Sequence, residues 1–296
     1  MTGRRESIMT LLILAAIIAA IVVLRKGSGR NVYRNGCYTA PTGKIWDLFE
    51  DMLNQPHLLI AGATGSGKSV AINGLLNTLL YRLPTDEGRD DGPDGVQFIL
   101  IDPKRVELAA YAELPHTLAH AAGFNPTAWQ AALDKAVKIM DDRYCYMERK
   151  RIKMYDKGDL YVVIDEWANV YKNGGKEAYK AVLRLISEGR AAKVHLIMAT
   201  QVPKANIIPT EIRENFSARL CLFTNNAAQS RVIMDENGCE DLPDPKTAGY
   251  AQGFYVLPGK GNNQLCTIPY VKEDEINRNI DWCLNQMKHR KAVRYV

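Results

Sequence analysis

The eight residues GATGSGKS at positions 62–69 decide the fold of this chain. They satisfy the pattern G-x-x-x-x-G-K-[ST], which starts at Gly62 and ends at Ser69, with an additional Gly65 inside it. The apolar run HLLIA precedes the pattern, and the segment VAINGLLNTLLYRL, whose apolar residues recur near helical spacing, follows it. A strand, a glycine-rich loop and a helix in this order predict a phosphate-binding loop.

Each part of this loop has an expected task in nucleotide binding. Glycines let successive backbone N–H groups turn toward one phosphate, in front of the positive end of a helix. Lys68 is expected to reach the β- and γ-phosphates, and the Ser69 hydroxyl is expected to take one position around Mg²⁺. The predicted cofactors are therefore ATP and Mg²⁺. The residues expected to hold the nucleotide are Gly62, Ala63, Thr64, Gly65, Ser66, Gly67, Lys68 and Ser69.

Strand-like apolar runs recur along the rest of the chain. They lie at 96–102, 160–165, 194–200, 218–224 and 253–257. Longer, polar-interleaved segments that favour helix, notably 127–154 and 176–190, separate most of them. Continuously apolar strands that alternate with helices predict an α/β fold with a mostly parallel sheet flanked by helices. The Pro-, Gly- and Asp-rich segment 83–95 predicts an exposed loop.

A P-loop enzyme also needs an acidic residue at the end of a neighbouring strand. Asp102 and Asp165 both follow strand-like runs. Asp165 is the better candidate because Glu166 follows it directly. Asp165 is expected to order the ligands of Mg²⁺, and Glu166 is expected to polarise the attacking water.

The N-terminal region contains an uncharged apolar stretch at residues 8–24, in which Thr10 is the single polar interruption. As a helix it would be about 25 Å long, the short end of a membrane span. A cleavable signal peptide is the alternative interpretation. Arg25 and Lys26 stand where a small-residue cleavage site is expected, and an ATP site belongs in the cytoplasm. We therefore expect an uncleaved membrane anchor.

Basic residues dominate on the C-terminal side of this stretch and predict that the bulk of the chain is cytoplasmic. The expected organisation is an anchor with a basic flank at 1–35, a lead-in at 36–56 and an ATPase domain at 57–296. The expected location is the bacterial cell membrane, crossed once.

The formal net charge of +5 is concentrated at the N-terminus. Residues 1–35 carry six Arg and Lys side chains and one Glu, so residues 36–296 are neutral overall. Bulk charge therefore does not favour nucleic-acid binding by the ATPase domain. The six cysteines form no C-x-x-C pair and have no nearby histidine arrangement, which favours reduced structural thiols over a zinc site or a disulfide framework.

Five segments resemble, in their order and spacing, the FtsK family of hexameric DNA-pumping ATPases. They are HLLIAGATGSGKSVAINGLL, LIDPKRVELAAYAELPHTL, YVVIDEWANV, GRAAKVHLIMATQ and SRVIMDENGCEDL. The resemblance covers residues from about 45 to 285 and implies a RecA-like P-loop NTPase fold, a ring of identical subunits, expected to be a hexamer, and double-stranded DNA as the substrate. The metal-associated and catalytic roles of Asp165 and Glu166 match the family pattern.

The resemblance adds three further site residues. Gln201 matches the residue that senses the γ-phosphate, and Arg190 matches the arginine that such rings offer to the ATP of the neighbouring subunit. Supplying a guanidinium in trans would couple hydrolysis to assembly. Arg231 matches a position linked with the DNA-facing pore, whereas Arg219 is a candidate for a structural role.

Two departures from the family pattern weaken the expected binding to DNA. Val202 stands where the family usually has Arg, and Ala227 stands where it has Lys. Lys193 and Lys204 are the candidate replacements. The densest basic run, at 143–157, has two interpretations: a DNA-binding surface, or a solvated helix face whose Tyr and Met residues pack inward.

Three functions are compatible with these features. The leading one is a membrane-anchored, ring-forming motor that translocates double-stranded DNA, as a DNA translocase or as a coupling protein for conjugation with a relaxase or other transfer machinery as partner. The chain ends soon after the motor, which suggests a minimal motor from a mobile element. An ATPase that drives protein secretion is the alternative. A scaffold that binds ATP without turnover is the third, and Glu166 and Gln201 argue against it.

Overall fold

The computed structural model describes residues 39–40, 43–80, 95–261 and 263–293, with side chains from 48 to 284 within these ranges. The predicted anchor at 1–35 and most of the predicted loop at 83–95 lie outside the described residues. No helix in the described part of the chain is long and apolar enough to cross a membrane.

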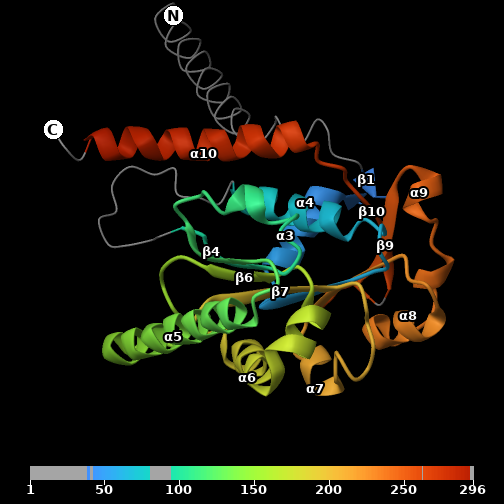
Figure 1. The fold of residues 1–296 in the computed structure, drawn as a ribbon, viewed down its shortest axis with the longest axis horizontal. Helices are drawn as coiled ribbons and strands as arrows, with labels where there is room; N and C mark the ends of the chain where they lie inside the picture. The colour runs from blue at the N-terminus through green and yellow to red at the C-terminus, as the bar shows by residue number, and fades with distance from the viewer. Residues whose placement is uncertain (1–38, 41–42, 81–94, 262, 294–296) are drawn as a thin grey trace, which may run out of the picture. The chain divides into compact units, whose positions relative to one another are not determined.

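An eight-stranded sheet forms the centre of the domain (Figure 1), in the order β10-β9-β8-β3-β7-β6-β4-β5. The strands are β3 (His57–Ala61), β4 (Gln97–Asp102), β5 (Thr117–Ala122), β6 (Leu160–Ile164), β7 (Val194–Thr200), β8 (Ala218–Leu222), β9 (Ala251–Val256) and β10 (Gln264–Ile268). The six strands from β8 to β5 in this order are parallel to one another, whereas β9 is antiparallel to β8 and β10 is antiparallel to β9. The prediction of a mostly parallel sheet is confirmed. A separate pair, β1 (Thr39–Ala40) and β2 (Gly43–Lys44), is antiparallel.

Helices cover both faces of this sheet (Figure 1). On one face lie α3 (Ile45–Leu53), α4 (Lys68–Leu80) and α10 (Glu273–Val293). On the other lie α5 (Pro126–Lys150) and α6 (Trp167–Glu188). The short helices are η1 (Ala109–Tyr111), α7 (Thr210–Arg213), α8 (Ala227–Met234), η2 (Cys239–Asp241) and α9 (Pro245–Ala248).

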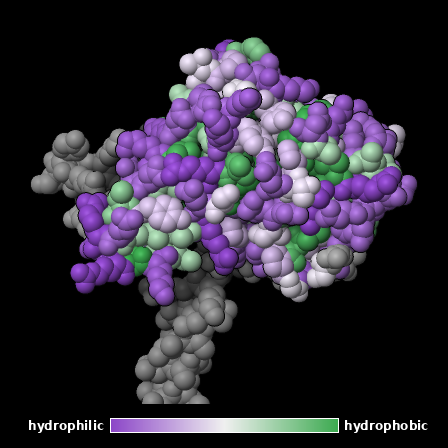
Figure 2. Space-filling model, turned by 90° about the horizontal axis from the view of Figure 1, so that it is seen from below, coloured by the Kyte–Doolittle hydropathy of each residue, from purple (hydrophilic) through white to green (hydrophobic). Residues whose placement is uncertain are grey.

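The buried strands explain why the sheet needs both helical layers. Every residue of β3 and of β6 is buried, as expected for parallel strands between two layers of helices. On the α5–α6 side, Trp129 and Trp167 are fully buried, and each indole N–H donates to a backbone carbonyl, that of Gly123 and that of Ile207. Seen from this side, the surface is mainly hydrophilic with small separate apolar areas (Figure 2).

Helix α6 is broken once along its length. Gly175 has φ 67° and ψ −156°, a conformation that divides the helix into two parts. Glu166 is the N-cap of this helix, and Arg190 follows its last residue, Glu188, by two positions. A Cβ at Gly175 would meet no atom within 4 Å, so glycine is required there by the backbone conformation and not by space.

The described cysteines are all free. Cys145 is exposed, and the other four are buried: Cys221, Cys239, Cys266 and Cys283. Burial raises the pKa of the Cys266 thiol to about 12. The prediction of reduced structural thiols agrees with this placement, while Cys37 lies outside the described residues.

Candidate nucleotide-binding site

The phosphate loop connects the end of β3 to the start of α4. Its backbone is held by the two strands that flank β3, because Gly62 N–H donates to Thr200 O at 3.3 Å and Ala63 N–H donates to Phe223 O at 2.8 Å. The N–H of Ala71 donates to Gly67 O at 2.9 Å and closes the first turn of α4. The sheet therefore fixes the loop at the carboxyl edge of the strands, where parallel α/β sheets bind their ligands.

The glycines of the loop are required by its geometry. Gly65 and Gly67 have φ of 81° and 94°, which disfavours any side chain. At Gly62 the backbone conformation is ordinary, but a Cβ would lie 2.3 Å from the Oγ of Ser66. The loop folds back on itself so closely that only hydrogen fits there.

Lys68 forms a buried ion pair with Asp165. Its Nζ lies 2.8 Å from Asp165 Oδ1 and donates also to the backbone carbonyl of Asp165 at 2.9 Å. Both residues are buried, and Asp165 directly follows β6. The two residues that the sequence assigned to the phosphates and to the metal therefore meet at one point, although they are far apart in the chain.

Glu166, Gln201 and Thr64 form a connected row of polar groups beside the loop. The Glu166 carboxylate accepts hydrogen bonds from Thr200 Oγ1 at 2.8 Å and from the backbone N–H of Gln201 at 3.0 Å. The side-chain oxygen of Gln201 in turn accepts from Thr64 Oγ1 at 3.0 Å. Because β7 lies between β3 and β6, Gln201 stands between the phosphate loop and the carboxylate. This position fits the predicted sensing role.

Lys104 contributes a contact that the sequence did not predict. Its Nζ lies 3.6 Å from Glu166 Oε2, on the side of the carboxylate away from β7. Lys104 follows β4, inside the IDPKRVEL segment that carried the family resemblance, but an exposed lysine in a loop gave no local signal of this contact.

Asp102, the weaker candidate for the metal-associated acid, has another task. Its Oδ1 accepts from the backbone N–H of Lys104, and its Oδ2 accepts from those of Glu107 and Leu108, all at 3.1 Å. Asp102 is fully buried and holds the loop that follows β4. Both of its carboxylate oxygens are used by backbone groups, which supports the choice of Asp165.

The residues around the loop fit a magnesium–nucleotide complex. Among the described side chains, two buried oxygens at this place have no hydrogen-bond partner, Ser66 Oγ and Asp165 Oδ2. A buried polar atom without a partner costs free energy, so such atoms favour a ligand that supplies one. A carboxylate oxygen suits the hydration shell of Mg²⁺, and Ser69 in the first turn of α4 offers the hydroxyl that the motif assigns to the metal.

Arg190 lies at the amino ends of the strands, opposite the end of the sheet that carries the phosphate loop. It sits in the turn between α6 and β7, before the first residue of β7, whereas the phosphate loop and Gln201 lie beyond the ends of β3 and β7. Its side chain is exposed and forms no ion pair with any described residue. The alternative interpretation, a surface salt-bridge partner, finds no support among the described residues.

The structure separates the predicted DNA contacts. Arg231 on α8 and Lys204 after β7 are exposed, but Lys193 lies before β7, at the other edge of the sheet. The Lys193 amine donates to Lys157 O at 3.0 Å. The two candidate replacements, Lys193 and Lys204, therefore lie at opposite ends of β7. Arg219 is structural, since it donates to Ile233 O and pairs with Asp235 at the end of α8.

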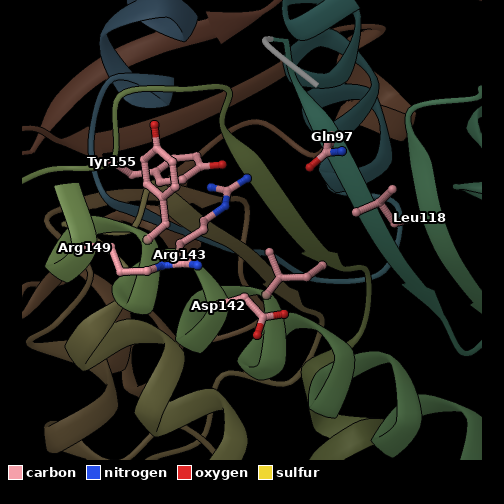
Figure 3. A pocket seen from close by; sticks show the side chains of 8 residues that line it. Gln97, Leu118, Asp142, Arg143, Arg149 and Tyr155 are labelled. Atoms are coloured by element: carbon pink, nitrogen blue, oxygen red, sulfur yellow. The ribbon is translucent and has the colours of Figure 1, made fainter. Parts of the chain in front are cut away.

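The basic run 143–157 packs partly inward. Arg143 is buried and donates to the carbonyls of Ala192 and Lys193, both at 2.8 Å, and its guanidinium lies 4.4 Å from the ring centroid of Tyr155. Burial lowers the pKa of Arg143. Beside it is a cavity of about 390 Å³ (Figure 3). Its lining residues include Gln97, the first residue of β4, so it lies toward the amino ends of the strands and away from the phosphate loop.

Comparisons with known proteins identify relatives of this chain. The model of the FtsK/SpoIIIE family matches residues 43–160. The chain is 34% identical over 258 residues to the DNA translocase FtsK of Helicobacter pylori strain 26695, covering 83% of this chain and 28% of that protein. It is 39% identical over 248 residues to the DNA translocase FtsK of Chlorobaculum tepidum, covering 78% and 29%. The chain thus spans less than a third of the length of these relatives.

Solved structures share the fold. The pCW3 conjugation coupling protein TcpA, solved with ATPγS, matches with a TM-score of 0.63 and 20% identity, over 78% of this chain and 66% of that one. The cytoplasmic domain of the Type VII secretion ATPase EccC from Thermomonospora curvata matches with a TM-score of 0.60 and 19% identity, over 77% and 28%. These findings, together with the phosphate loop and its acidic pair, support ATPase activity, and the chain belongs to the FtsK/SpoIIIE family.

Proposed function

We propose that this chain is the subunit of a ring-shaped motor, a hexamer, that hydrolyses ATP to move double-stranded DNA. The motor would act as a DNA translocase or as a coupling protein for conjugation. The proposal draws on the FtsK relatives, whose name is DNA translocase, and on a site that combines a phosphate loop with a buried acidic pair.

One observation supports a ring-shaped assembly: the phosphate loop and Arg190 lie at opposite ends of the strands of the same sheet. Between Arg190 and Gln201 lie three turn residues and the seven residues of β7, and β7 alone spans about 20 Å at the rise of an extended strand. An arginine side chain cannot bridge that gap, so Arg190 can reach only the nucleotide of another subunit. A contact between two different surfaces of the same chain is head-to-tail, and it closes into a ring when the rotation permits.

Only a few exposed basic residues support DNA as the substrate. Arg231 and Lys204 remain as exposed candidates for phosphate contacts, and Val202 and Ala227 offer none. A neutral domain with few such contacts per subunit should bind duplex DNA without sequence preference and lose affinity steeply with salt, because each phosphate contact releases counterions.

The test is the ATPase rate of the full-length chain, purified in detergent, against duplex concentration at several salt concentrations, with single-stranded DNA as control. We expect stimulation by duplexes of any sequence, strongest at low salt. Arg231→Ala and Lys204→Ala should reduce the stimulation and preserve basal turnover, while Lys176→Ala, an exposed lysine on α6, should behave as wild type. Absence of stimulation in protein that binds ATP and assembles would contradict the DNA assignment.

That negative outcome would favour the alternative, an ATPase that drives protein secretion. The neutral charge of residues 36–296 suits a polypeptide substrate as well as DNA, and the fold is shared with a secretion ATPase. DNA-stimulated turnover therefore separates the two functions.

We further propose that residues 8–24 anchor the motor in the bacterial cell membrane, with the ATPase domain in the cytoplasm and a relaxase or other transfer machinery as partner. The uncharged stretch and the basic residues after it support this arrangement. Full-length protein should stay with carbonate-washed membranes, whereas a variant without residues 1–35 should leave them. Carbonate release of the full-length chain would contradict the anchor.

A further inference from the structure

Lys246 approaches the phosphate loop from the flank opposite the hydrolytic carboxylate. Strand β3 lies between β7 and β8. Glu166 and Gln201 reach the loop from the β6–β7 side, while α9, which carries Lys246, directly precedes β9 on the far side of β8. The loop is therefore bordered by an acidic and amide pair on one flank and by a lysine on the other.

The contact between α9 and the loop is close. A Cβ at Gly65 would lie 2.7 Å from Lys246 Cε and 3.5 Å from its Nζ. A Cβ at Gly67 would lie 2.5 Å from the Cβ of Ala251, the first residue of β9. The segment from α9 to β9 thus packs against the loop at two positions, and the amine of Lys246 lies beside the backbone whose N–H groups would surround a phosphate.

Local hydrogen bonds fix the segment that presents this lysine. The Asp244 side chain accepts from the backbone N–H of Lys246 at 3.0 Å, and Thr247 Oγ1 donates to Asp244 O at 3.0 Å. Pro245 begins the short helix, and Gly249 ends it with φ 77°. The backbone of Lys246 is therefore well defined.

The Lys246 ammonium has no acidic partner in the described part of the chain. No described carboxylate lies within 4 Å of its Nζ, and its side chain makes no hydrogen bond there. By contrast, Lys68 is paired with Asp165 and Lys104 faces Glu166. Of these three lysines around the loop, Lys246 is the one whose charge is left for an anion.

We propose that Lys246 is a second phosphate-binding cation of this site, which contacts the α- and β-phosphates that ATP and ADP share. The inference rests on the proposed ATPase function. Because the lysine lies away from Glu166, it stabilises bound ATP and bound ADP to the same extent, and it acts on nucleotide affinity and not on the cleavage step.

Two substitutions separate charge from packing. Lys246→Met retains an aliphatic chain over Gly65 and removes the ammonium, and Lys246→Arg retains a cation. With the full-length chain in detergent, the dissociation constants of ADP and of ATPγS should both rise about tenfold in Lys246→Met, the effect of one lost charge-assisted hydrogen bond. Lys246→Arg should stay within about threefold of wild type. Lys176→Met is the matched control and should bind as wild type.

A second readout does not depend on substitution. Acetylation of Lys246 by an N-hydroxysuccinimide ester, followed by peptide mass spectrometry, should slow at least severalfold when ADP is added, while acetylation of Lys176 should not change. Equal dissociation constants in Lys246→Met and wild type, or Lys246 acetylation unaffected by ADP, would overturn the inference. A loss confined to ATPγS would also overturn it, because it would place the lysine at the γ-phosphate.

These results distinguish the inference from the function on which it rests. If the folded wild-type chain binds neither ADP nor ATPγS, the proposed function fails. If wild type binds both nucleotides, Lys68→Ala loses them and Lys246→Met binds as wild type, the inference about Lys246 alone fails.

Discussion

The carboxylate of Glu166 is held by the backbone of Gln201, whose N–H lies 3.0 Å from Oε1 and 3.1 Å from Oε2. The side chain of the same glutamine is bonded to Thr64 in the phosphate loop. The residue assigned to the attacking water and the residue assigned to the γ-phosphate are therefore mechanically linked, and a change at the phosphate loop reaches the carboxylate through a single amino acid.

Glu166→Gln should bind ATP and fail to hydrolyse it. The amide keeps the size of the side chain, and its oxygen can keep the hydrogen bonds from Thr200 and Gln201 that Oε1 accepts, but it cannot polarise water, so turnover should fall about 100- to 10,000-fold. Single-turnover hydrolysis of radiolabelled ATP, with nucleotide affinity measured in parallel, checks this. Glu177→Gln, an exposed carboxylate on the same helix, is the control. Normal turnover in Glu166→Gln would mean that another group activates the water.

Arg190→Ala should bind ATP with normal affinity and lose about 1,000-fold or more in turnover, because the charge that stabilises the transferring phosphoryl group is missing from the neighbouring site. Mixing it with Lys68→Ala protein should restore part of the activity, since each subunit supplies what its neighbour lacks. The measurement is the ATPase rate across mixing ratios. Inactive mixtures, in rings shown by crosslinking to contain both variants, would argue that Arg190 acts elsewhere.

Lys104→Met should lower the turnover number about threefold to tenfold with little change in KM, because the described contact of Lys104, 3.6 Å from Glu166, positions the catalytic carboxylate. Lys104→Arg should recover most of the rate. Steady-state kinetics of both variants check this, and a rise in KM without a fall in turnover number would show that Lys104 binds the nucleotide directly.

The stability of the domain should fall below neutral pH partly because of His57. Burial lowers the pKa of this histidine from 6.5 to about 3, with a smaller contribution from His195. Below pH 6.5 the unfolded chain binds a proton that the folded chain refuses, so the free energy of unfolding falls by up to about 1.4 kcal/mol per pH unit down to pH 3.

His57→Asn isolates this contribution. In the wild type, His57 Nδ1 accepts the backbone N–H of Leu196 at 3.1 Å, and an asparagine oxygen preserves an acceptor without a titrating group. Urea unfolding followed by tryptophan fluorescence between pH 4 and 7 should give a shallower pH dependence for the variant. Parallel curves for the two proteins would show that His57 does not carry the effect.

Much of the fold was predictable because most of the parallel strands are mainly apolar. The run at 194–200 became β7 residue for residue, and 57–61 became β3. Two strands of the eight-stranded sheet were missed for an identifiable reason. The β5 sequence TLAHAA has little strand propensity and is mostly half-buried, and the β10 sequence QLCTI is a short edge strand. β5 and β10 are strands because they pair with neighbouring strands, and their own residues give little indication of it.

The site was predictable only where it follows a local motif. Lys68 and Asp165 belong to patterns that fix their place at the ends of β3 and β6, so their ion pair could be expected. Lys104 and Lys246 are exposed lysines in or near loops, and their contacts arise from strand order in the sheet. Lys193 is close to Gln201 in the sequence, but the length of β7 places it at the amino end of that strand, away from the phosphate loop.

Helix α6 runs from Glu166, the carboxylate that we assign to ATP hydrolysis in its own subunit, to within two residues of Arg190, the arginine that we assign to the ATP of the neighbouring subunit. The break at Gly175 divides this helix into two parts. In the proposed ring, the hydrolytic carboxylate of one subunit and the arginine that serves the next site are thus joined by one 22-residue helix that is broken at Gly175. In such a ring, hydrolysis in one subunit is coupled to hydrolysis in the next, and the subunits do not fire independently.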